Sequence, residues 1–310
     1  MNRCLRCYEP LENGGEFHDQ CARDFFRTNV DAKLPFSLND IDAMAKEHVL
    51  TQVAVPGVQK KLSLHLRKSR GQRDRLTIVG YQGDYILKPP TDTYPELPEL
   101  EDVTMHMAEI CGIDVVPHTL MRLRSGERAY ITRRVDRIRP GVKRHMEDLC
   151  QVSGRLTEYK YSGSVEQLGK LIYRHSIAPG LDRINFFELL LFCFLTGNAD
   201  MHLKNFSLLR HEEGYRLAPA YDLLPTKLVL PADMEESALT VDGKKRRLDR
   251  ASYLRAADTL GIPRMAAEKS LSAMLEAIPA CLEFLKRSFV STEMQEEYRA
   301  LITSRVERLS

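Results

Sequence analysis

The 310-residue sequence contains no tryptophan, and only 7% of its residues are aromatic. It has no apolar run close to the roughly 20 residues that a membrane-spanning helix needs, and no apolar signal-peptide core near its start. Its formal net charge is only +2, so no excess of one sign favours direct binding to a large polyanion such as nucleic acid. We therefore expect a cytoplasmic protein of one two-lobed domain or two small ones, without membrane contact.

Cysteine occurs in two groups, the first of them near the start of the chain. Cys4-x2-Cys7 and His18-x2-Cys21 bring four soft ligands together in two close pairs. This pattern suits tetrahedral zinc, and a site whose four positions are all filled by protein would be structural. A disulfide between two of these cysteines is the alternative interpretation. The remaining cysteines lie in or beside apolar stretches and are expected to be reduced core residues: Cys111, Cys150, Cys193 and Cys281.

A buried helix and a small hairpin frame the polar segment that says most about function. Residues 185–197 are apolar nearly all round, which predicts a helix inside a core that ends at Gly197. Residues 206–210 and 215–218 then predict the two strands of a hairpin. Polar residues in the loops beside these elements would be held by a rigid scaffold, which is where catalytic groups are usually found.

These loops contain Asp200, Asn205 and Asp222, an acid followed by an amide five residues on and by a second acid seventeen residues later. Phosphoryl transfer from Mg-ATP uses this order, because one carboxylate orients or deprotonates the attacking hydroxyl while the amide and the second carboxylate hold the metal. The Asp-x4-Asn half of the protein-kinase pattern is met, but Asp222 stands alone rather than in Asp-Phe-Gly. The alternative is that Asp200 and Asn205 only cap turn backbone.

A glycine-containing segment upstream is a candidate for binding the nucleotide. Residues 53–66 predict a strand, a turn at Gly57 and a second strand. The glycine lets backbone come close to a phosphate, and Lys60 or Lys61 could neutralise its charge. An ordinary hairpin explains the same residues, so this segment by itself does not decide between the two.

A strand that ends at Lys88 and a helix predicted for residues 97–111 form the second upstream candidate. The helix begins with several acids, and one of them could pair with Lys88 and orient it towards ATP, as in kinases. Alternatively, acids at a helix N-terminus only offset the helix dipole. Residues 129–132 predict a further strand that could line an adenine pocket. The C-terminal part is expected to be helical at residues 252–260, 265–288 and 292–308, with a possible break at Pro279.

An ordered set of short motifs makes the chain resemble the HipA family of bacterial serine/threonine kinases, the toxins of toxin–antitoxin pairs. The resemblance covers about residues 50 to 260, and the ordered set is specific although each piece is short. It is carried by Val55-Pro-Gly-Val-Gln-Lys-Lys-Leu62, Tyr85-Ile-Leu-Lys-Pro89, the helix from Glu99 to Gly112, Arg134-Val-Asp-Arg137, His145-Met-Glu-Asp-Leu-Cys-Gln151, Lys160-Tyr161, Asp200-Met-His-Leu-Lys-Asn205 and Leu217-Ala-Pro-Ala-Tyr-Asp222.

The resemblance implies an α+β, two-lobed protein-kinase-like fold with a mostly helical C-lobe. Together with the N-terminal cysteines, it leads us to expect a zinc-knuckle-like segment at residues 1–30 and an N-lobe with the phosphate loop and Lys88 at residues 31–135. A C-lobe with the catalytic and metal-binding loops would occupy residues 136–310. The chain is shorter than the longer toxins, so we expect their extra N-terminal subdomain to be a separate protein, as in the shortened family members.

Carried over position by position, the resemblance also implies roles for single residues. Asp200 is the expected catalytic acid, and His202 and Lys204 of the same loop would support phosphate or substrate geometry. Asn205 and Asp222 would bind Mg²⁺. The expected ATP contacts are Lys88, Gly57 and Lys61 of the phosphate loop, and Glu101 as the helix acid, with Glu99 as the alternative.

The sequence departs from the family's pattern at positions that bear on regulation and nucleotide binding. Serines of the phosphate loop that become autophosphorylated in family members are matched here by Ala54 and Pro56. We therefore expect this form of regulation to be absent or relocated. Arg133 stands where a typical member has Glu in the strand that leads to the second lobe. Because backbone groups can make the adenine contacts there, function need not suffer.

The function that this resemblance predicts is a serine/threonine protein kinase that uses ATP and Mg²⁺, with structural Zn²⁺ as a further cofactor. It would be the toxin of a toxin–antitoxin system and would phosphorylate a cytosolic protein such as an aminoacyl-tRNA synthetase. Its expected partners are that substrate, a helix-turn-helix antitoxin of the HipB type and a separate protein resembling the HipA N-subdomain, with nucleic acid reached only through the antitoxin. The alternatives are a small-molecule kinase of the aminoglycoside or choline type and a non-catalytic nucleotide-binding scaffold of an antitoxin–DNA complex.

Overall fold

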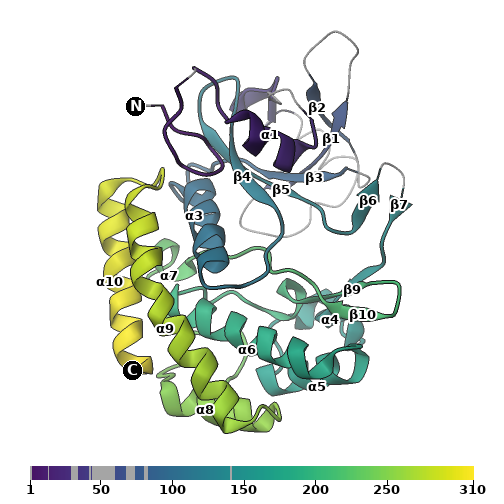
Figure 1. The fold of residues 1–310 in the computed structure, drawn as a ribbon, viewed down its shortest axis with the longest axis vertical. Helices are drawn as coiled ribbons and strands as arrows, with labels where there is room; N and C mark the ends of the chain where they lie inside the picture. Colours follow the sequence, from purple (N-terminus) through teal and green to yellow (C-terminus); the bar gives the residue numbers. More distant parts are fainter. Residues whose placement is uncertain are drawn as a thin grey trace. The chain divides into compact units, whose positions relative to one another are not determined.

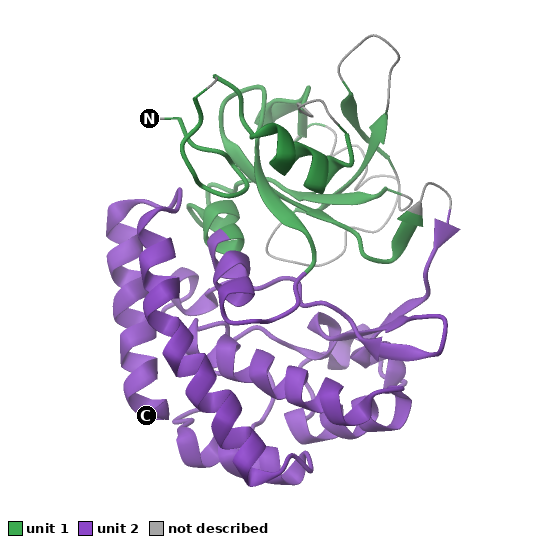
Figure 2. Ribbon diagram, viewed as in Figure 1, with its two compact units in different colours: residues 1–102, 116–141 green, residues 103–115, 142–310 purple. Residues whose placement is uncertain are grey.

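A five-stranded antiparallel sheet organises the first part of the chain, and the rest is mostly helical (Figure 1). The structure is a computed structural model that describes residues 2–12, 14–28, 34–41, 43, 60–67, 74–79, 83–139 and 142–310. The chain divides into two compact units, coloured separately in Figure 2: residues 1–102 with 116–141, and residues 103–115 with 142–310. The domain boundaries expected from the sequence, at residues 30 and 135, stay predictions.

The sheet of the first unit has the strand order β2-β1-β3-β5-β4, and every neighbouring pair is antiparallel. Its strands are β1 (Leu62–Arg67), β2 (Arg75–Ile78), β3 (Tyr85–Lys88), β4 (His118–Arg122) and β5 (Arg128–Arg133). Side chains alternate between the faces along a strand, and directly paired residues share a face. Because Tyr85 pairs with Leu64 and Arg133, these three side chains lie on one face, whereas Lys88 and its partner Tyr130 lie on the other.

Helix α1 (Asp19–Phe26) covers the sheet face that carries Tyr85. The ring centres of Phe25 and Phe26 lie 5.7 and 6.1 Å from that of Tyr85, and all three side chains are buried. Removing each phenylalanine from water contributes roughly 2 kcal/mol. The N-terminal segment is therefore part of the hydrophobic core of the first unit.

Helix α6 (Pro179–Leu195) is the buried helix expected from the apolar run, and it forms the centre of the second unit. It begins earlier than expected because Pro179 lies at the first helical position, where the missing N–H costs no hydrogen bond. It ends just before Gly197, whose φ of 69° is left-handed and readily adopted only by glycine.

The other helices of the second unit surround α6 or lie on the loops beside it. Their bounds are α4 (Leu149–Val152), α5 (Val165–His175), α7 (Thr226–Val229), α8 (Arg250–Thr259), α9 (Arg264–Lys286) and α10 (Thr292–Leu309), with the 3₁₀ turns η1 (Thr157–Tyr159) and η2 (Leu203–Asn205). Helix α9 continues through Pro279, so the break considered there does not occur. Proline removes one backbone hydrogen bond, and the buried stripe formed by Leu271, Met274 and Ile278 offsets that loss.

A three-stranded antiparallel sheet in the second unit holds the predicted hairpin. Its order is β10-β9-β8, with β8 (Met146–Asp148), β9 (Ser207–Arg210) and β10 (Tyr215–Leu217). The hairpin strands β9 and β10 were expected, but β8 was not. Its addition brings Asp148 opposite Ser207, at the end of the loop that begins after α6.

Asp182 fixes the hairpin to α6. Its fully buried carboxylate accepts hydrogen bonds from Arg216 Nε at 3.0 Å, from the Leu217 backbone N–H at 2.8 Å and from Ser176 Oγ at 2.6 Å. A buried carboxylate without such partners would be strongly destabilising, so this set explains why an acid is tolerated in the core. Helix and hairpin are thus tied together at a defined point.

Helix α3 (Leu97–Ile110) is divided between the two units. Residues through Asp102 belong to the first unit, and those from Val103 onward belong to the second. The short strands β6 (Arg137–Arg139) and β7 (Val142–Lys143) mark the later passage of the chain from one unit to the other. Among the described residues, none of the helices combines the length and apolar character needed to cross a membrane.

Candidate active site

The loop that follows α6 is held in place by hydrogen bonds from its successive backbone N–H groups up to Asp200. The Asn198 N–H donates to Cys193 O at 2.8 Å, and the Ala199 N–H donates to Thr226 Oγ1 at 2.8 Å. The Asp200 N–H then donates to Asn198 Oδ1 at 3.2 Å. Asp200 therefore has a fixed backbone, as a catalytic carboxylate requires.

The carboxylate of Asp200 contacts Tyr161, and the ring of Tyr161 in turn packs against His202. Tyr161 donates a hydrogen bond from its hydroxyl to Asp200 Oδ1 at 2.8 Å, and the ring centre of His202 lies 5.0 Å from that of Tyr161. Burial and the nearby Asp200 charge raise the pKa of Tyr161, which keeps its hydroxyl protonated as a donor. Local sequence pattern assigns no role to Tyr161, although this residue belongs to the Lys160-Tyr161 motif of the resemblance.

The pKa of His202 is affected by both acids of the predicted site. Burial lowers its pKa, while the charges of Asp200 and, less strongly, Asp222 oppose that effect and Lys160 adds to it. The two carboxylates thus act on one imidazole, which burial keeps mainly neutral near pH 7. Its Nδ1 atom is buried and has no hydrogen-bond partner among the described residues. A buried polar atom of this kind is a place where a bound group can be accommodated.

Asn205 closes the loop back onto its start. It is buried, and its amide nitrogen lies 3.5 Å from Asp200 O and 3.7 Å from Met201 Sδ. Both contacts use the nitrogen, whereas a magnesium ion would take the Oδ1 atom. Asp222 has a φ of 61°, which is uncommon for any residue but glycine and is best tolerated by Asn and Asp. Such backbone strain is often stored at functional sites.

Lys204 lies in the same loop but has a structural partner. Its Nζ donates to Asp148 Oδ2 at 2.7 Å, and Asp148 Oδ1 accepts from the Gln151 N–H as the N-cap of α4. The Tyr221 hydroxyl donates to Lys204 O at 2.9 Å, which ties the loop to the residue before Asp222. Asp148 was missed from the sequence; the His145-to-Gln151 motif that contains it was the available signal.

In the first unit, Lys88 forms a buried ion pair with Glu101. The exposed fractions of the two residues are 3% and 1%, and Lys88 Nζ lies 5.3 Å from the centre of the Tyr130 ring. Glu99, the alternative acid, instead accepts from Arg128 Nε at 2.8 Å. Burial raises the pKa of Glu99, and the Arg128 charge opposes this rise. The role of Lys88 towards ATP stays a prediction.

The phosphate loop expected from the sequence lies largely outside the described residues. This applies to Gly57, as well as to Ala54 and Pro56. Lys61 is described, and it is exposed immediately before β1.

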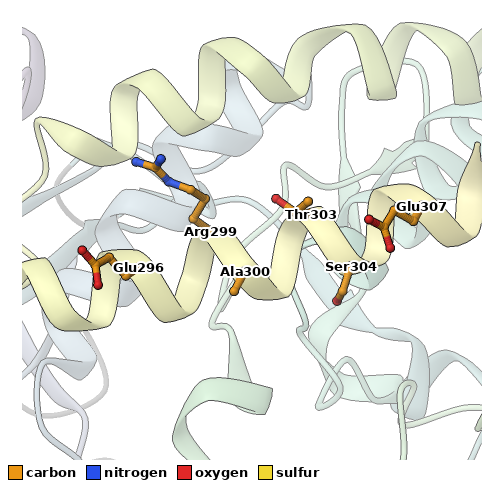
Figure 3. Close-up of a pocket in the computed structure, with 6 residues that line it drawn as sticks. All are labelled: Glu296, Arg299, Ala300, Thr303, Ser304 and Glu307. Carbon is orange, nitrogen blue, oxygen red and sulfur yellow. The ribbon is translucent and has the colours of Figure 1, made fainter.

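The residue types of the predicted metal site are of the kind that magnesium prefers. Mg²⁺ prefers hard oxygen ligands, and Asn205 and Asp222 supply an amide oxygen and a carboxylate. His202 lies two residues after Asp200, and its buried Nδ1 atom has no hydrogen-bond partner among the described residues. A bound group could therefore form a hydrogen bond there. In contrast, the hollow of about 460 Å³ in Figure 3 is lined by residues of α10 alone, from Glu296 to Glu307, and contains none of the predicted site residues.

Comparison with known proteins identifies relatives of this chain. A family model described as the HipA-like C-terminal domain matches residues 53–282. The protein of Sinorhizobium fredii named "Putative kinase Y4mE" is 34% identical over 183 residues, which are 56% of this chain and 43% of that protein. The serine/threonine-protein kinase toxin HipA of Shewanella oneidensis is 27% identical over 256 residues, which are 74% of this chain and 57% of that protein. The chain thus spans about half the length of these curated relatives.

Solved structures confirm the fold class. A chain in the Shewanella oneidensis complex of HipA, HipB and operator DNA matches with a TM-score of 0.67 and 22% identity, covering 86% of this chain and 70% of that one. The Helicobacter pylori proinflammatory kinase CtkA matches with a TM-score of 0.53 and 16% identity, covering 80% and 98%. The α+β, two-lobed kinase-like fold predicted from the sequence is therefore correct. Since the family model covers well over half of the sequence, the chain belongs to the family of HipA-like C-terminal domains.

Proposed function

We propose that this protein is a serine/threonine protein kinase that transfers the terminal phosphoryl group of ATP in the presence of Mg²⁺. The observation that carries the proposal is the fixed position of Asp200, whose backbone N–H is bonded within its loop and whose carboxylate accepts a hydrogen bond from Tyr161 at 2.8 Å. It supports a site in which this carboxylate is held ready to orient a substrate hydroxyl. The kinase names of several relatives support the same reaction class.

In the proposed reaction, Asp200 orients a substrate hydroxyl and takes its proton as the oxygen attacks the terminal phosphorus and the bond to the ADP oxygen breaks. Tyr161 holds one oxygen of Asp200 by its hydrogen bond. Asn205 and Asp222 would hold Mg²⁺, which would supply positive charge beside the phosphates. Neutral His202 offers its Nδ1 atom to substrate or phosphate, and Lys204 keeps the loop in shape through Asp148.

Lys88 is proposed to contact the ATP phosphates, with Glu101 fixing its position. Gly57 and Lys61 of the phosphate loop are proposed to add contacts to the same groups. A lysine that is paired with a helix acid loses little entropy when a phosphate binds, so the pair is prepared for its ligand.

We further propose that the protein acts as the toxin of a toxin–antitoxin pair on a cytosolic protein such as an aminoacyl-tRNA synthetase. Support comes from the toxin name of the Shewanella oneidensis relative and from the HipB-containing complex. By analogy, a helix-turn-helix antitoxin of the HipB type would be its partner and would provide any contact with DNA. A separate N-subdomain-like protein is a further proposed partner.

Transfer of radiolabel from ATP into proteins of a bacterial lysate tests the reaction. Wild type should label protein in a Mg²⁺-dependent manner, and Asp200→Asn should not. Asp258→Asn is a matched control, because Asp258 is an exposed acid on α8 in the same unit. Labelling of small alcohols with no labelling of protein would favour the small-molecule kinase. Binding of ATP without any transfer by wild type would favour the non-catalytic scaffold.

A further inference from the structure

Four potential metal ligands converge in the N-terminal segment, outside the part of the chain that the family model matches. We propose that Cys4, Cys7, His18 and Cys21 bind one zinc ion, and that this centre fastens the N-terminal segment to the edge of the sheet and to helix α3. All of these residues belong to the first unit. The proposal does not depend on the kinase reaction.

The distances within the cluster match tetrahedral coordination. One ligand atom from each of the four residues lies within 4.8 Å of all the others. Zn–S bonds of about 2.3 Å in a tetrahedron place sulfur atoms roughly 3.8 Å apart, so a small contraction around the ion would complete the site. His18 Nδ1 already lies 3.3 Å from Cys7 Sγ and 3.9 Å from Cys21 Sγ.

His18 is held in the tautomer that metal binding needs. Its Nε2 atom lies 3.0 Å from Pro10 O, and because a carbonyl oxygen only accepts, Nε2 must carry the proton. The lone pair is then on Nδ1, the nitrogen that faces the sulfur atoms. Zinc-binding histidines characteristically donate their second ring N–H to a carbonyl or carboxylate in this way. This contact is independent of the cysteine spacing.

The local backbone presents the ligands from two short elements. The Tyr8 N–H donates to Cys4 O at 3.0 Å, which closes a turn that contains Cys4 and Cys7. His18 is the N-cap residue of α1, and Cys21 lies three positions later in the first helical turn. Three thiols cannot all be consumed by disulfides within the cluster, whereas one tetrahedral ion uses all three together with the imidazole.

The same segment pairs with the edge strand β4. Leu5 O accepts from the Leu120 N–H at 3.3 Å and from Thr119 Oγ1 at 3.0 Å, and Arg122 Nε donates to Glu16 at 3.1 Å. Leu5 lies between two of the proposed ligands, so fixing the cluster also fixes this contact. The segment covers backbone groups that an edge strand would otherwise expose.

A second connection leads from the cluster to α3. The Tyr8 hydroxyl donates to Asp102 Oδ2 at 2.6 Å, and Asp102 Oδ1 lies 2.7 Å from His118 Nδ1. Tyr8 directly follows the ligand Cys7, and Asp102 directly follows Glu101. These buried side chains form a continuous contact from the proposed metal centre to the helix turn that carries the partner of Lys88.

Arg133 provides a third connection, between β5 and the C-terminal end of α1. This contact gives a reason for the departure from the family's pattern at this position. The Arg133 guanidinium donates to Asp24 O at 3.2 Å and to Phe25 O at 3.1 Å, at the C-terminal end of α1. A cation suits the negative end of a helix, and the glutamate of a typical member could not donate to these carbonyls. Arg133 therefore holds α1, the helix whose N-cap is the proposed ligand His18.

Metal analysis of the purified full chain tests the proposal. We expect about one zinc per chain in wild type and in Cys111→Ser, a cysteine outside the cluster, and at least tenfold less in Cys21→Ser. Because Cys21→Ser could fail to fold, Co²⁺ exchange into wild type gives a second measurement. Tetrahedral cobalt bound by three thiolates should show intense visible and sulfur-to-metal absorption bands.

The role as a fastener has its own readout. Tyr8→Phe should retain one zinc but lower the midpoint of thermal unfolding by several degrees, since it loses a buried hydrogen bond to Asp102. Chelation of the wild-type metal should lower the midpoint further. Wild-type protein that is folded, holds no zinc and gives no cobalt–thiolate bands would overturn the metal site. Unchanged unfolding after complete metal removal would overturn the fastening role.

Discussion

Tyr161 donates a hydrogen bond to Asp200 Oδ1 at 2.8 Å, linking the loop after η1 to the proposed catalytic acid 39 residues later in the sequence. A hydrogen bond to one carboxylate oxygen restricts the rotation of the aspartate side chain. Tyr161 is only half-buried, so it can hold Asp200 in place while Asp200 stays accessible to a substrate.

Replacing Tyr161 should therefore slow phosphoryl transfer without unfolding the protein. We expect Tyr161→Phe to lower kcat about tenfold, which corresponds to one charge-assisted hydrogen bond of about 1.4 kcal/mol, while KM for ATP changes little. Steady-state kinetics measures both. Tyr159→Phe is the control, because Tyr159 is similarly exposed on η1. Equal rates for the two variants would rule out a positioning role for Tyr161.

Asp222 can be changed with little disturbance of its backbone. Asparagine tolerates the left-handed conformation, so Asp222→Asn should fold normally but lose about a hundredfold or more in Mg²⁺-dependent transfer. Asp222→Ala should lose activity to the same extent and also some stability, about 1 kcal/mol, because alanine is strained at positive φ. Kinetics and thermal unfolding distinguish the two effects. Full activity in either variant would remove Asp222 from the site.

The two acids at the start of α3 allow a matched comparison. Glu101→Gln should raise KM for ATP and destabilise the protein by roughly 3 kcal/mol, because the buried Lys88 loses its charged partner. Glu99→Gln should cost about 1 kcal/mol or less, since its partner Arg128 is partly exposed. Chemical denaturation and ATP titration measure these changes. The pairing of Lys88 with Glu101 would lose its proposed importance if both variants behaved alike.

His202 predicts a specific dependence of stability on pH. Its pKa in the folded protein is lowered, so the unfolded chain binds its proton more readily. Stability should be constant above the unfolded value of about 6.5 and should fall as pH drops below it. His202→Gln lacks this contribution, and all other groups cancel in the comparison. Denaturation at pH 8 and pH 5.5 should show a smaller loss for the variant; an equal loss would contradict the assignment.

The sequence was most informative where local pattern and tertiary environment agree. The apolar run before Gly197 predicts a buried helix because no face of it is suited to water, and α6 is such a helix. The hairpin β9–β10 follows for a similar reason, since two short apolar segments are separated by the turn-like residues 211–214. Only the start of α6 was misplaced, because Ala178 and Pro179 give little sign of a helix before the apolar residues begin.

Contacts between distant segments could not be obtained in this way. Tyr161 and Asp148 contact the Asp200 loop only because η1, α4 and β8 fold beside it. The local sequence around these two residues does not predict that contact. Glu99 and Glu101 are two positions apart, so composition alone could not decide which acid meets Lys88. The fold of α3 against the sheet decides it by turning Glu99 towards Arg128.

Because Asp182 attaches α6 to the hairpin, the length of α6 determines where the Asp200 loop lies relative to the hairpin. The acid is near one end of the helix and Asp200 follows the other, so the number of helical residues between them sets both separation and rotation. One inserted residue would turn the Asp200 loop by about 100° around the axis and advance it by about 1.5 Å relative to β10. The position of the Asp200 loop therefore depends more on the number of residues in α6 than on the identity of its apolar side chains.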